Sequence, residues 1–425
     1  MITLASQQSH ANGYHFLHQS TEGFGSAYST NGTAINDISA MFSNPASIAR
    51  FDGTHFSTGV ALDFPRSTFD NVVATAPYSG MPVPGVPAVP TQFIDTAFGA
   101  ATYATKQLSD DLYFGLSFTA PYAYVSEYPR EAASRYQATL TKLFAYNLSP
   151  TLAYKVDDKL SLAFGANIQY YTNKLNTQIS TNINDPMPAT DVKSEIEAQD
   201  IGYGFSLGME YQFNSDTRIG LSYRSEIKHS FDGDMRLSGT TANMAALAAE
   251  IPTLNAYQGS AEFKINTPSM LQMGLLHKVT DKLELYANAN LTGWTAFKDT
   301  YINFNNGFPT VVVDNGWDDS WYVGIGAGYQ WDEKLKLRTG VAYDWTPTPA
   351  DVVSPRAPNH DRMYAAAGMT YQVNPNWKLD AGYLFILFEE VHVRLAGGNN
   401  IPRGTLSGDI NLYANVFMFQ VNHSF

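Results

Sequence analysis

The chain of 425 residues contains no cysteine, which excludes a disulfide scaffold, a zinc site with cysteine ligands and a thiol nucleophile. Charge is also scarce, because charged residues make up 15% of the chain against about 25% in typical soluble domains. No apolar run approaches the roughly 18 residues of a membrane-spanning helix. The few basic residues leave a formal net charge of -13, which argues against nucleic acid as a partner.

Aromatic residues, in contrast, are abundant, with 26 tyrosines, 25 phenylalanines and 6 tryptophans. Low charge without a hydrophobic helix leaves one membrane architecture, the transmembrane β-barrel, in which aromatic side chains form girdles at both interfaces. The composition therefore favours an all-β membrane protein.

The first residues lack the apolar core of a complete secretory signal, yet Ser9-His10-Ala11 fits the small-x-small pattern of a cleavage site. We interpret residues 1–11 as the remnant of a signal peptide, with the mature chain starting near Asn12. A polar N-terminal tail that is never cleaved is the alternative.

From residue 54 onward, apolar and polar residues alternate in runs of about ten or more. This is the period of a strand with one lipid face and one wet face. The run 321–331 carries three glycines on the wet face, Gly324, Gly326 and Gly328. Small residues there indicate that another segment packs closely against the inner wall.

Short and long connections between these runs alternate, which allows the strands to be counted. Six connections are tight and polar and are typical of hairpin turns. They are centred on residues 108–111, 156–158, 214–216, 279–281, 331–333 and 374–376. Seven longer connections lie between them, at residues 65–92, 121–135, 174–199, 230–258, 298–316, 346–360 and 394–406. Six turns and seven loops require fourteen antiparallel strands, and this asymmetry is typical of outer-membrane barrels.

Residues 12–51 lack the alternation and are rich in small residues. A barrel of fourteen strands leaves a lumen that wall side chains do not fill. We therefore predict two units, an N-terminal hatch over residues 12–51 that plugs the lumen and a barrel over residues 52–425. The chain ends on an alternating strand with a terminal phenylalanine, Phe425, which resembles the signal for barrel assembly.

Several motifs resemble the outer-membrane transporters of long-chain fatty acids (FadL type). In the hatch they are Gly23 to Tyr28, Asn36-Asp37 and Asn44-Pro45-Ala46. Along the barrel they are Pro121-Tyr122, Glu127-Tyr128, Arg135-Tyr136, Arg338-Thr339-Gly340, residues 346–349 (TPTP) and residues 358–362 (PNHDR). Their order and spacing cover nearly the whole chain.

The resemblance implies passive uptake of a hydrophobic small molecule across the outer membrane of a Gram-negative bacterium. Extracellular loops would capture the molecule, and a gap beside the third strand would release it sideways. Phe118, Pro121 and Tyr122 are the candidates for this opening, because proline removes a donor from the ladder. The alternative is that Pro121 only ends the strand. We expect no cofactor, a monomer, and contact with outer-membrane lipid and lipopolysaccharide.

The loop at residues 230–258 contains an apolar series at helical spacing, Met244, Leu247, Ile251 and Leu254. An apolar helix face on an extracellular loop is a candidate site of ligand capture. Packing of the same face against neighbouring loops is the equally weighted alternative.

A fatty acid carries a carboxylate, for which basic residues facing the lumen are candidate partners. Alternation places Arg218, Arg224, Lys228, Lys336 and Arg338 on inward faces, because charge facing lipid costs about 2–4 kcal/mol. Of these, Arg224 and Arg338 are our candidate ligand-binding residues. Ion pairs with hatch or wall acids are the alternative use of most of them.

Catalytic motifs such as HExxH, the Walker A loop and GxSxG are absent from the sequence, and no metal site is expected. A fatty-acid transporter is therefore the leading hypothesis. An importer of aromatic hydrocarbons, a lipid-acting barrel enzyme and a general porin are the alternatives.

Overall fold

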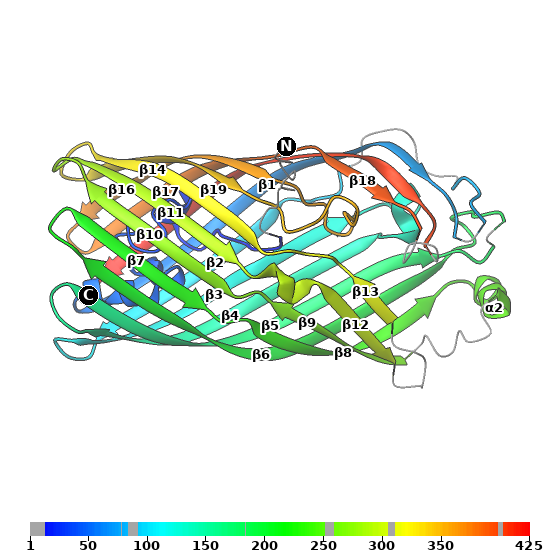
Figure 1. Cartoon of the computed structure of the whole chain (residues 1–425), viewed down its shortest axis with the longest axis horizontal. Coiled ribbons are helices and arrows are strands. Elements are labelled where there is room, and N and C mark those ends of the chain that lie inside the picture. The colour runs from blue at the N-terminus through cyan, green and yellow to red at the C-terminus, as the bar shows by residue number, and fades with distance from the viewer. Residues whose placement is uncertain are drawn as a thin grey trace, which may run out of the picture.

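The computed structural model describes residues 13–77, 79–83, 92–182, 184–250, 259–304, 311–397 and 403–425. The predicted signal remnant, residues 1–11, lies outside these residues. The described part forms a closed antiparallel barrel in which β1 pairs with both β2 and β19 (Figure 1). No helix among the described residues is long and apolar enough to span a membrane.

Fourteen staves make up the wall, as predicted, and five of them contain two strands each. The first six staves are β1 (Thr54–Ala74), β2 (Ala97–Gln107), β3 (Leu112–Glu127), β4 (Leu140–Lys155), β5 (Leu160–Ile179) and β6 (Val192–Gln212). The next four are β7 (Thr217–Arg224) with β8 (Ile227–Ser238), β9 (Gly259–Thr267) with β10 (Met270–Lys278), β11 (Leu283–Thr292) with β12 (Asp299–Phe304), and β13 (Val311–Asp314) with β14 (Ser320–Gln330). The last four are β15 (Leu335–Asp344), β16 (Arg362–Asn374), β17 (Trp377–Phe388), followed along the chain by the short β18 (Val391–Leu395), and β19 (Leu406–Ser424).

The six predicted hairpin turns are confirmed, and one local device recurs in them. A short polar side chain early in the turn accepts hydrogen bonds from backbone N–H groups two to three residues later. Asp157 Oδ1 accepts from the N–H groups of Lys159 (2.7 Å) and Leu160 (2.8 Å). Asn214, Thr280, Asp332 and Asn374 make the same pair of bonds in their turns.

The longer connections are shorter than the sequence indicated, because several strands continue beyond the apolar zone. β5 extends to Ile179 and β6 begins at Val192, although residues 174–199 were expected to form a loop. Exposed charged side chains such as Glu197 occupy the outward face there. Apolar and polar residues alternate only where one face of the strand meets lipid. Beyond the lipid zone the alternation therefore ends, although the backbone hydrogen bonds between β5 and β6 continue. Figure 1 shows these extensions at the end that carries α2 (Thr241–Glu250).

Residues 13–51, which we call the N-terminal segment, are almost entirely buried inside the described wall. The segment contains α1 (Thr21–Phe24), η1 (Ile38–Phe42) and η2 (Pro45–Arg50). Figure 1 shows these short helices within the barrel, near the end with the short turns. Two inward glycines allow close approach of the segment, because a Cβ at Gly326 would meet Ser29 and one at Gly340 would meet the carbonyl of Ser26.

The Asn44-Pro45-Ala46 motif fixes one of these helices to the wall. Asn44 caps η2 by accepting from the Ala46 N–H at 3.0 Å, and Pro45 occupies the first helical position, where its missing N–H costs nothing. The amide of Asn44 also donates to the carbonyl of Met209 on β6 at 2.9 Å. The motif therefore starts the helix and attaches it to the barrel at the same residue.

Candidate ligand-binding cavity and wall opening

The barrel wall is interrupted between β2 and β3. The two strands pair as far as Thr102↔Phe118, and the ladder ends there among the described residues, although both strands continue. β1 likewise pairs with β2 only as far as Asp63↔Ala97. Backbone hydrogen bonds that close the rest of the wall are therefore missing at this place.

Residues 92–94 cross above the interruption and connect its two sides. The N–H of Phe93 donates to Ser67 Oγ on β1 at 2.9 Å, and the N–H of Glu127 on β3 donates to the carbonyl of Phe93 at 2.8 Å. We call the enclosed opening the window. It is bounded by residues 63–67 of β1, 92–97 of the connection, 97–101 of β2 and 119–127 of β3.

Pro121 lies on the edge of the window. The register between β3 and β4 shifts between Thr119 and Tyr122, which is where proline lacks a donor for the ladder. Strand β3 nevertheless continues to Glu127, so Pro121 does not end it. The register shift in the third strand thus coincides with the proline that the sequence singled out, and the role of Pro121 in a lateral opening stays a prediction.

The N-terminal segment occupies part of the edge of β3 that β2 leaves unpaired. The N–H of Phe16 donates to the carbonyl of Pro121 at 2.8 Å. The side-chain amide of Gln19 imitates a neighbouring strand, because it donates to the carbonyl of Ala120 at 2.9 Å and accepts from the Ala120 N–H at 3.2 Å. The window is therefore lined from inside by residues that are not themselves part of the wall.

Aromatic rings form both rims of the window. On the lipid side, Phe118 is 52% exposed and stacks on Tyr146 with ring centroids 6.2 Å apart. On the lumen side, Tyr122 is buried against His15 and Trp294, at centroid distances of 5.4 and 6.3 Å. The three residues predicted for a lateral opening thus lie at the window, Phe118 outside, Pro121 on the edge and Tyr122 inside.

A cavity of about 510 Å³ lies behind the window. Its wall is formed by residues 13–18 and by parts of β1, β2, β3, β4, β16, β17 and β19, and it is mainly apolar. The large apolar side chains around it include Phe16, Leu17, Pro65, Phe98, Phe144, Ile386, Phe388 and Leu412. Phe98 also lines the cavity and is 67% exposed on the outer surface, so the cavity reaches the lipid-facing side of the barrel.

Arg362, the first residue of β16, supplies positive charge to this cavity. Its Nη2 donates to the carbonyl of Gly13 at 2.9 Å and to Asn359 Oδ1 at 2.7 Å, and its guanidinium lies over the Phe388 ring at 4.8 Å. Nε is buried and has no partner among the described residues. A guanidinium has five N–H donors, so the group is held in place with donor capacity to spare.

Two buried histidines of the N-terminal segment, His15 and His18, also line the cavity. Burial, together with the positive charge of nearby arginines, lowers the pKa of each to about 3; Arg224 and Arg362 act on His15, and Arg362 acts on His18. Both rings are therefore neutral at pH 7. Charge recognition in the cavity falls to Arg362, whereas the histidines offer hydrogen bonds and ring surface.

Arg224, a predicted ligand-binding residue, does not line this cavity. It borders a separate space of about 20 Å³, donates to the carbonyl of Phe42 at 2.8 Å and lies over the Phe42 ring at 4.6 Å. These contacts hold η1 against the wall. Its role toward a ligand stays a prediction.

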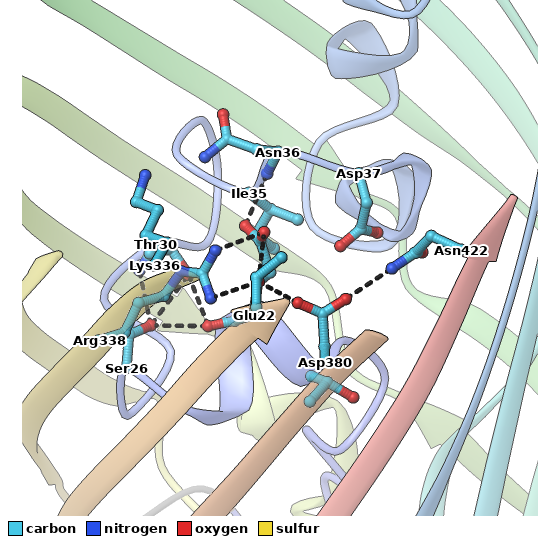
Figure 2. Close-up of polar contacts among 12 residues, drawn as sticks. Glu22, Ser26, Thr30, Ile35, Asn36, Asp37, Lys336, Arg338, Asp380 and Asn422 are labelled. Carbon is cyan, nitrogen blue, oxygen red and sulfur yellow. Dashed lines mark hydrogen bonds and ion pairs between the residues drawn. The ribbon is translucent and has the colours of Figure 1, made fainter. Parts of the chain in front are cut away.

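Arg338, the second predicted basic residue, is held by the N-terminal segment. Its Nη2 forms an ion pair with Glu22 Oε1 at 2.5 Å, and the two side chains are 2% and 3% exposed. Figure 2 shows Arg338 directed at Glu22, which also accepts from the N–H of Asn36 at 2.7 Å. The neighbouring Asp380 accepts from the amide of Asn422 at 2.6 Å. Arg338 therefore lies in a buried polar network away from the cavity.

Ion pairing of the inward basic residues was the alternative use that the sequence left open, and several of them do form such pairs. Lys336 pairs with Glu284 at 2.5 Å, and Arg218 lies 3.4 Å from Glu210. The same Glu210 accepts from Ser47 of the segment at 2.7 Å. The Ser47–Glu210 hydrogen bond and the Glu22–Arg338 ion pair thus tie the segment to two parts of the wall, β6 and β15.

We expect Arg338→Met to loosen the N-terminal segment and to leave ligand affinity unchanged. Removal of one partner leaves the Glu22 carboxylate buried and unpaired, which typically costs about 3–5 kcal/mol. Proteolysis within residues 13–51 should become much faster, while equilibrium binding of hexadecanoate stays constant. Arg394→Met, at an exposed position of β18, is the matched control. Weaker binding with an unchanged cleavage rate would instead give Arg338 a role in ligand recognition.

The predicted helix in the loop after β8 is present as α2, with Met244 and Leu247 on it. Leu247 is fully buried against Val192 and Leu237, and Met244 packs on the same cluster. This is the packing alternative. Ile251 and Leu254 lie outside the described residues, and capture of ligand by this face stays a prediction.

Sequence reasoning did not select Asp63 and Arg362, two charged residues that line the cavity. Arg362 is the last residue of the PNHDR motif at residues 358–362, and its place at the start of a strand could have marked it as a candidate. Asp63 follows Ala61 by two positions on the inward face of β1, so alternation alone could have placed it there.

Comparison with known proteins agrees with this architecture. A family model described as outer membrane protein transport protein (OMPP1/FadL/TodX) matches residues 2–425. The chain belongs to this family. Members are outer-membrane transport proteins, which confirms the predicted location and the prediction of a transporter rather than an enzyme.

Relatives within this family share about a quarter of the sequence. A long-chain fatty acid transport protein of Escherichia coli O6:H1 is 26% identical over 411 residues, covering 92% of this chain and 90% of the relative. Outer membrane protein P1 of Haemophilus influenzae is 26% identical over 460 residues, covering 100% of this chain and 97% of the relative.

Solved structures show the same fold. A Pseudomonas aeruginosa FadL homologue superposes with a TM-score of 0.88 at 24% identity, covering 97% of this chain and 100% of that one. The Ralstonia pickettii toluene transporter TbuX gives a TM-score of 0.64 at 16% identity, covering 97% and 99%. Proteins with this fold thus include a FadL homologue and a transporter named for toluene.

Proposed function

We propose that this family member takes up long-chain fatty acids or similar hydrophobic compounds with one acidic group, passively, through the window. The observation that carries the proposal is a mainly apolar cavity that reaches the lipid-facing surface and holds Arg362 on one wall. A ligand that leaves through the window enters the bilayer directly, so its alkyl chain stays out of water. The transfer free energy that this avoids is about 0.8 kcal/mol per methylene.

Import of aromatic hydrocarbons is the second candidate, favoured by the toluene transporters among the structural neighbours. A hydrocarbon would gain nothing from a buried guanidinium with unused donors, whereas a carboxylate would. Arg362 therefore supports the fatty acid over the hydrocarbon.

The surface facing the membrane supports a monomer surrounded by lipid. Large apolar side chains are exposed on staves around the whole wall, such as Phe164, Leu207, Ile325 and Phe419. We propose that this surface contacts outer-membrane lipid and lipopolysaccharide directly.

We likewise propose that residues 12–51 act as the hatch, because the N-terminal segment forms ion pairs with the wall from inside.

We expect Arg362→Gln to weaken binding of hexadecanoate by about tenfold to a hundredfold, because hydrogen bonds to a charged group contribute about 1.5–3 kcal/mol. Binding of hexadecanol, which has the same chain without the charge, should change little. Equilibrium binding of both ligands to the purified full chain measures this difference, with Arg394→Gln at an exposed position of β18 as the control. Unchanged hexadecanoate affinity, or much tighter binding of toluene to the unmodified chain, would favour the hydrocarbon importer.

A further inference from the structure

Two lysines lie side by side on the outer face of the wall, where β4 pairs with β5. Lys142 and Lys174 are directly opposed in the register of these strands. Alternation places both on the same face as the exposed rings of Tyr146 and Tyr170. The Cβ atoms of directly opposed residues are about 4.5–5.5 Å apart, so two like charges destabilise such a pair unless an anion lies between them.

The height of the two lysines follows from the apolar band below them. Every second side chain of β4 from Phe144 to Tyr154 is apolar or aromatic and faces outward. Ten residue steps at about 3.4 Å each and a strand tilt of about 40° give a height of about 25 Å, which is that of the apolar band of an outer-membrane barrel. Lys142 is the next outward residue above Phe144. Its ammonium group therefore lies at the level of the phosphates of the outer leaflet.

The two ammonium groups differ in their partners. Lys174 Nζ lies 3.1 Å from Glu197 Oε2 and 3.5 Å from Glu195 Oε2. Lys142 forms no ion pair within the described part of the chain. An ammonium group has three N–H donors, so an anion between the two lysines could accept hydrogen bonds from both.

A groove of about 730 Å³ runs past both lysines on the outer surface. Phe144 and Tyr170 line it beside the lysines, and Asp232 and Asp234 line its far side. Those carboxylates belong to β8, three strand spacings from β4. They are thus about 14 Å from Lys142 around the wall, beyond the Debye length of about 8 Å at physiological ionic strength. An anion in this groove is favoured only at its Lys142 end.

We propose that Lys142 and Lys174 bind a phosphate group of the lipid A part of lipopolysaccharide, with the acyl chains along the aromatic rings below. This inference deepens the lipid contact proposed above. A phosphate monoester carries a charge of about −1.5 to −2 at pH 7 and has three acceptor oxygens, which suits two ammonium groups. The carboxylate of a released fatty acid carries a single charge. The continuity of the groove with the lipid-facing surface identifies the occupant as a lipid.

The phosphate site lies one strand from the window. Lys142 is directly opposite Val125, on the part of β3 that bounds the window. Phe144 lines both the groove and the cavity behind the window. Its ring stacks on Tyr146, which stacks on Phe118 at the lipid-side rim. The acyl chains of a lipopolysaccharide molecule held here lie against this row of rings, so a released ligand enters the bilayer beside them.

Native mass spectrometry of the full chain in detergent micelles tests the site. The probes are lipid A with two phosphates and the same lipid after removal of both. We expect Lys142→Gln to weaken binding of phosphorylated lipid A about fivefold, and the double variant with Lys174→Gln about twenty-five-fold, as estimated for lysines at an anionic lipid surface. Binding of the dephosphorylated lipid should stay the same in both variants.

Controls separate the site from charge in general. Lys159→Gln makes the same change at the opposite end of the β4–β5 hairpin, where Lys159 is exposed, and should leave the affinity unchanged. Lys142→Arg should retain it. Millimolar inorganic phosphate should not displace the lipid, whereas displacement would make free phosphate the occupant and overturn the proposal. If Lys142→Gln does not fold, protection of Lys142 from acetylation by phosphorylated lipid A alone carries the test.

Binding of hexadecanoate to the same samples keeps this site distinct from the proposed function. Equal affinity of Lys142→Gln and the unmodified chain for phosphorylated lipid A would overturn the site and leave fatty-acid uptake standing. Weaker hexadecanoate binding with unchanged lipid A binding would assign Lys142 to the transported ligand and also overturn it. Absence of hexadecanoate binding by the unmodified chain, with lipid A bound as expected, would overturn the proposed function alone.

Discussion

Uptake of a labelled fatty acid will fall to background when the window is closed covalently from outside. The register of the intact part of the β2–β3 ladder, continued upward, brings Ala100 opposite Ala120, and these two residues are not paired in the structure. A cysteine at each position, linked by a short thiol reagent that reduction can cleave, would bridge the opening. Because the sequence has no cysteine, the reagent has no other target.

The control for this experiment lies four residues below, in the same two strands. Ala104 and Leu116 are paired neighbours in the intact ladder, so a linked cysteine pair there adds no new constraint. Uptake should persist with the control pair linked and should recover in the window pair after reduction. Equal uptake with the window linked and unlinked would show that the ligand leaves by another route, such as displacement of the N-terminal segment.

Deletion of residues 12–46 should leave a folded barrel that conducts ions in planar bilayers, where the full chain conducts little. The deletion removes Glu22 and Asn44 and with them the contacts that hold the N-terminal segment in place. A wall of fourteen staves encloses more space than its own side chains fill, so the conductance should rise by roughly tenfold or more.

Circular dichroism and heat-modifiable mobility will show whether the truncated barrel is folded, which the continuous β1–β19 pairing leads us to expect. Glu22→Gln serves as the matched control, because it weakens one ion pair and leaves the segment present. Unchanged conductance of a folded truncated barrel would mean that residues 12–46 do not obstruct the lumen.

Much of the wall could be predicted because a barrel in lipid imposes a simple pattern. Each membrane-spanning strand must alternate, and each hairpin needs a residue such as Asp157 or Asn214 to close it. The limits of the strands were predicted less well. Beyond the apolar zone the outward faces of β5 and β6 carry polar and charged side chains such as Glu197, so the alternation that marks a membrane-spanning strand disappears there.

The candidate site, too, could be predicted only in part from the sequence. Pro121 was visible in the sequence as a proline within an alternating run, because its effect on the ladder is local. Arg224 and Arg338 could be placed on inward faces but could not be distinguished from Arg362. Which of these guanidiniums meets a cavity and which meets Phe42 or Glu22 depends on residues hundreds of positions away.

The sequence by itself determined the barrel, its number of staves, its turns and the separate character of residues 12–51, since all of these follow from local periodicity and composition. Only the tertiary structure decided where the wall is open and what lies behind the opening. The window exists because β2 and β3 stop pairing above Thr102 and Phe118, and the cavity exists because the N-terminal segment fills the lumen incompletely. Both depend on distances between elements that are remote in sequence, and periodicity carries no information about those distances.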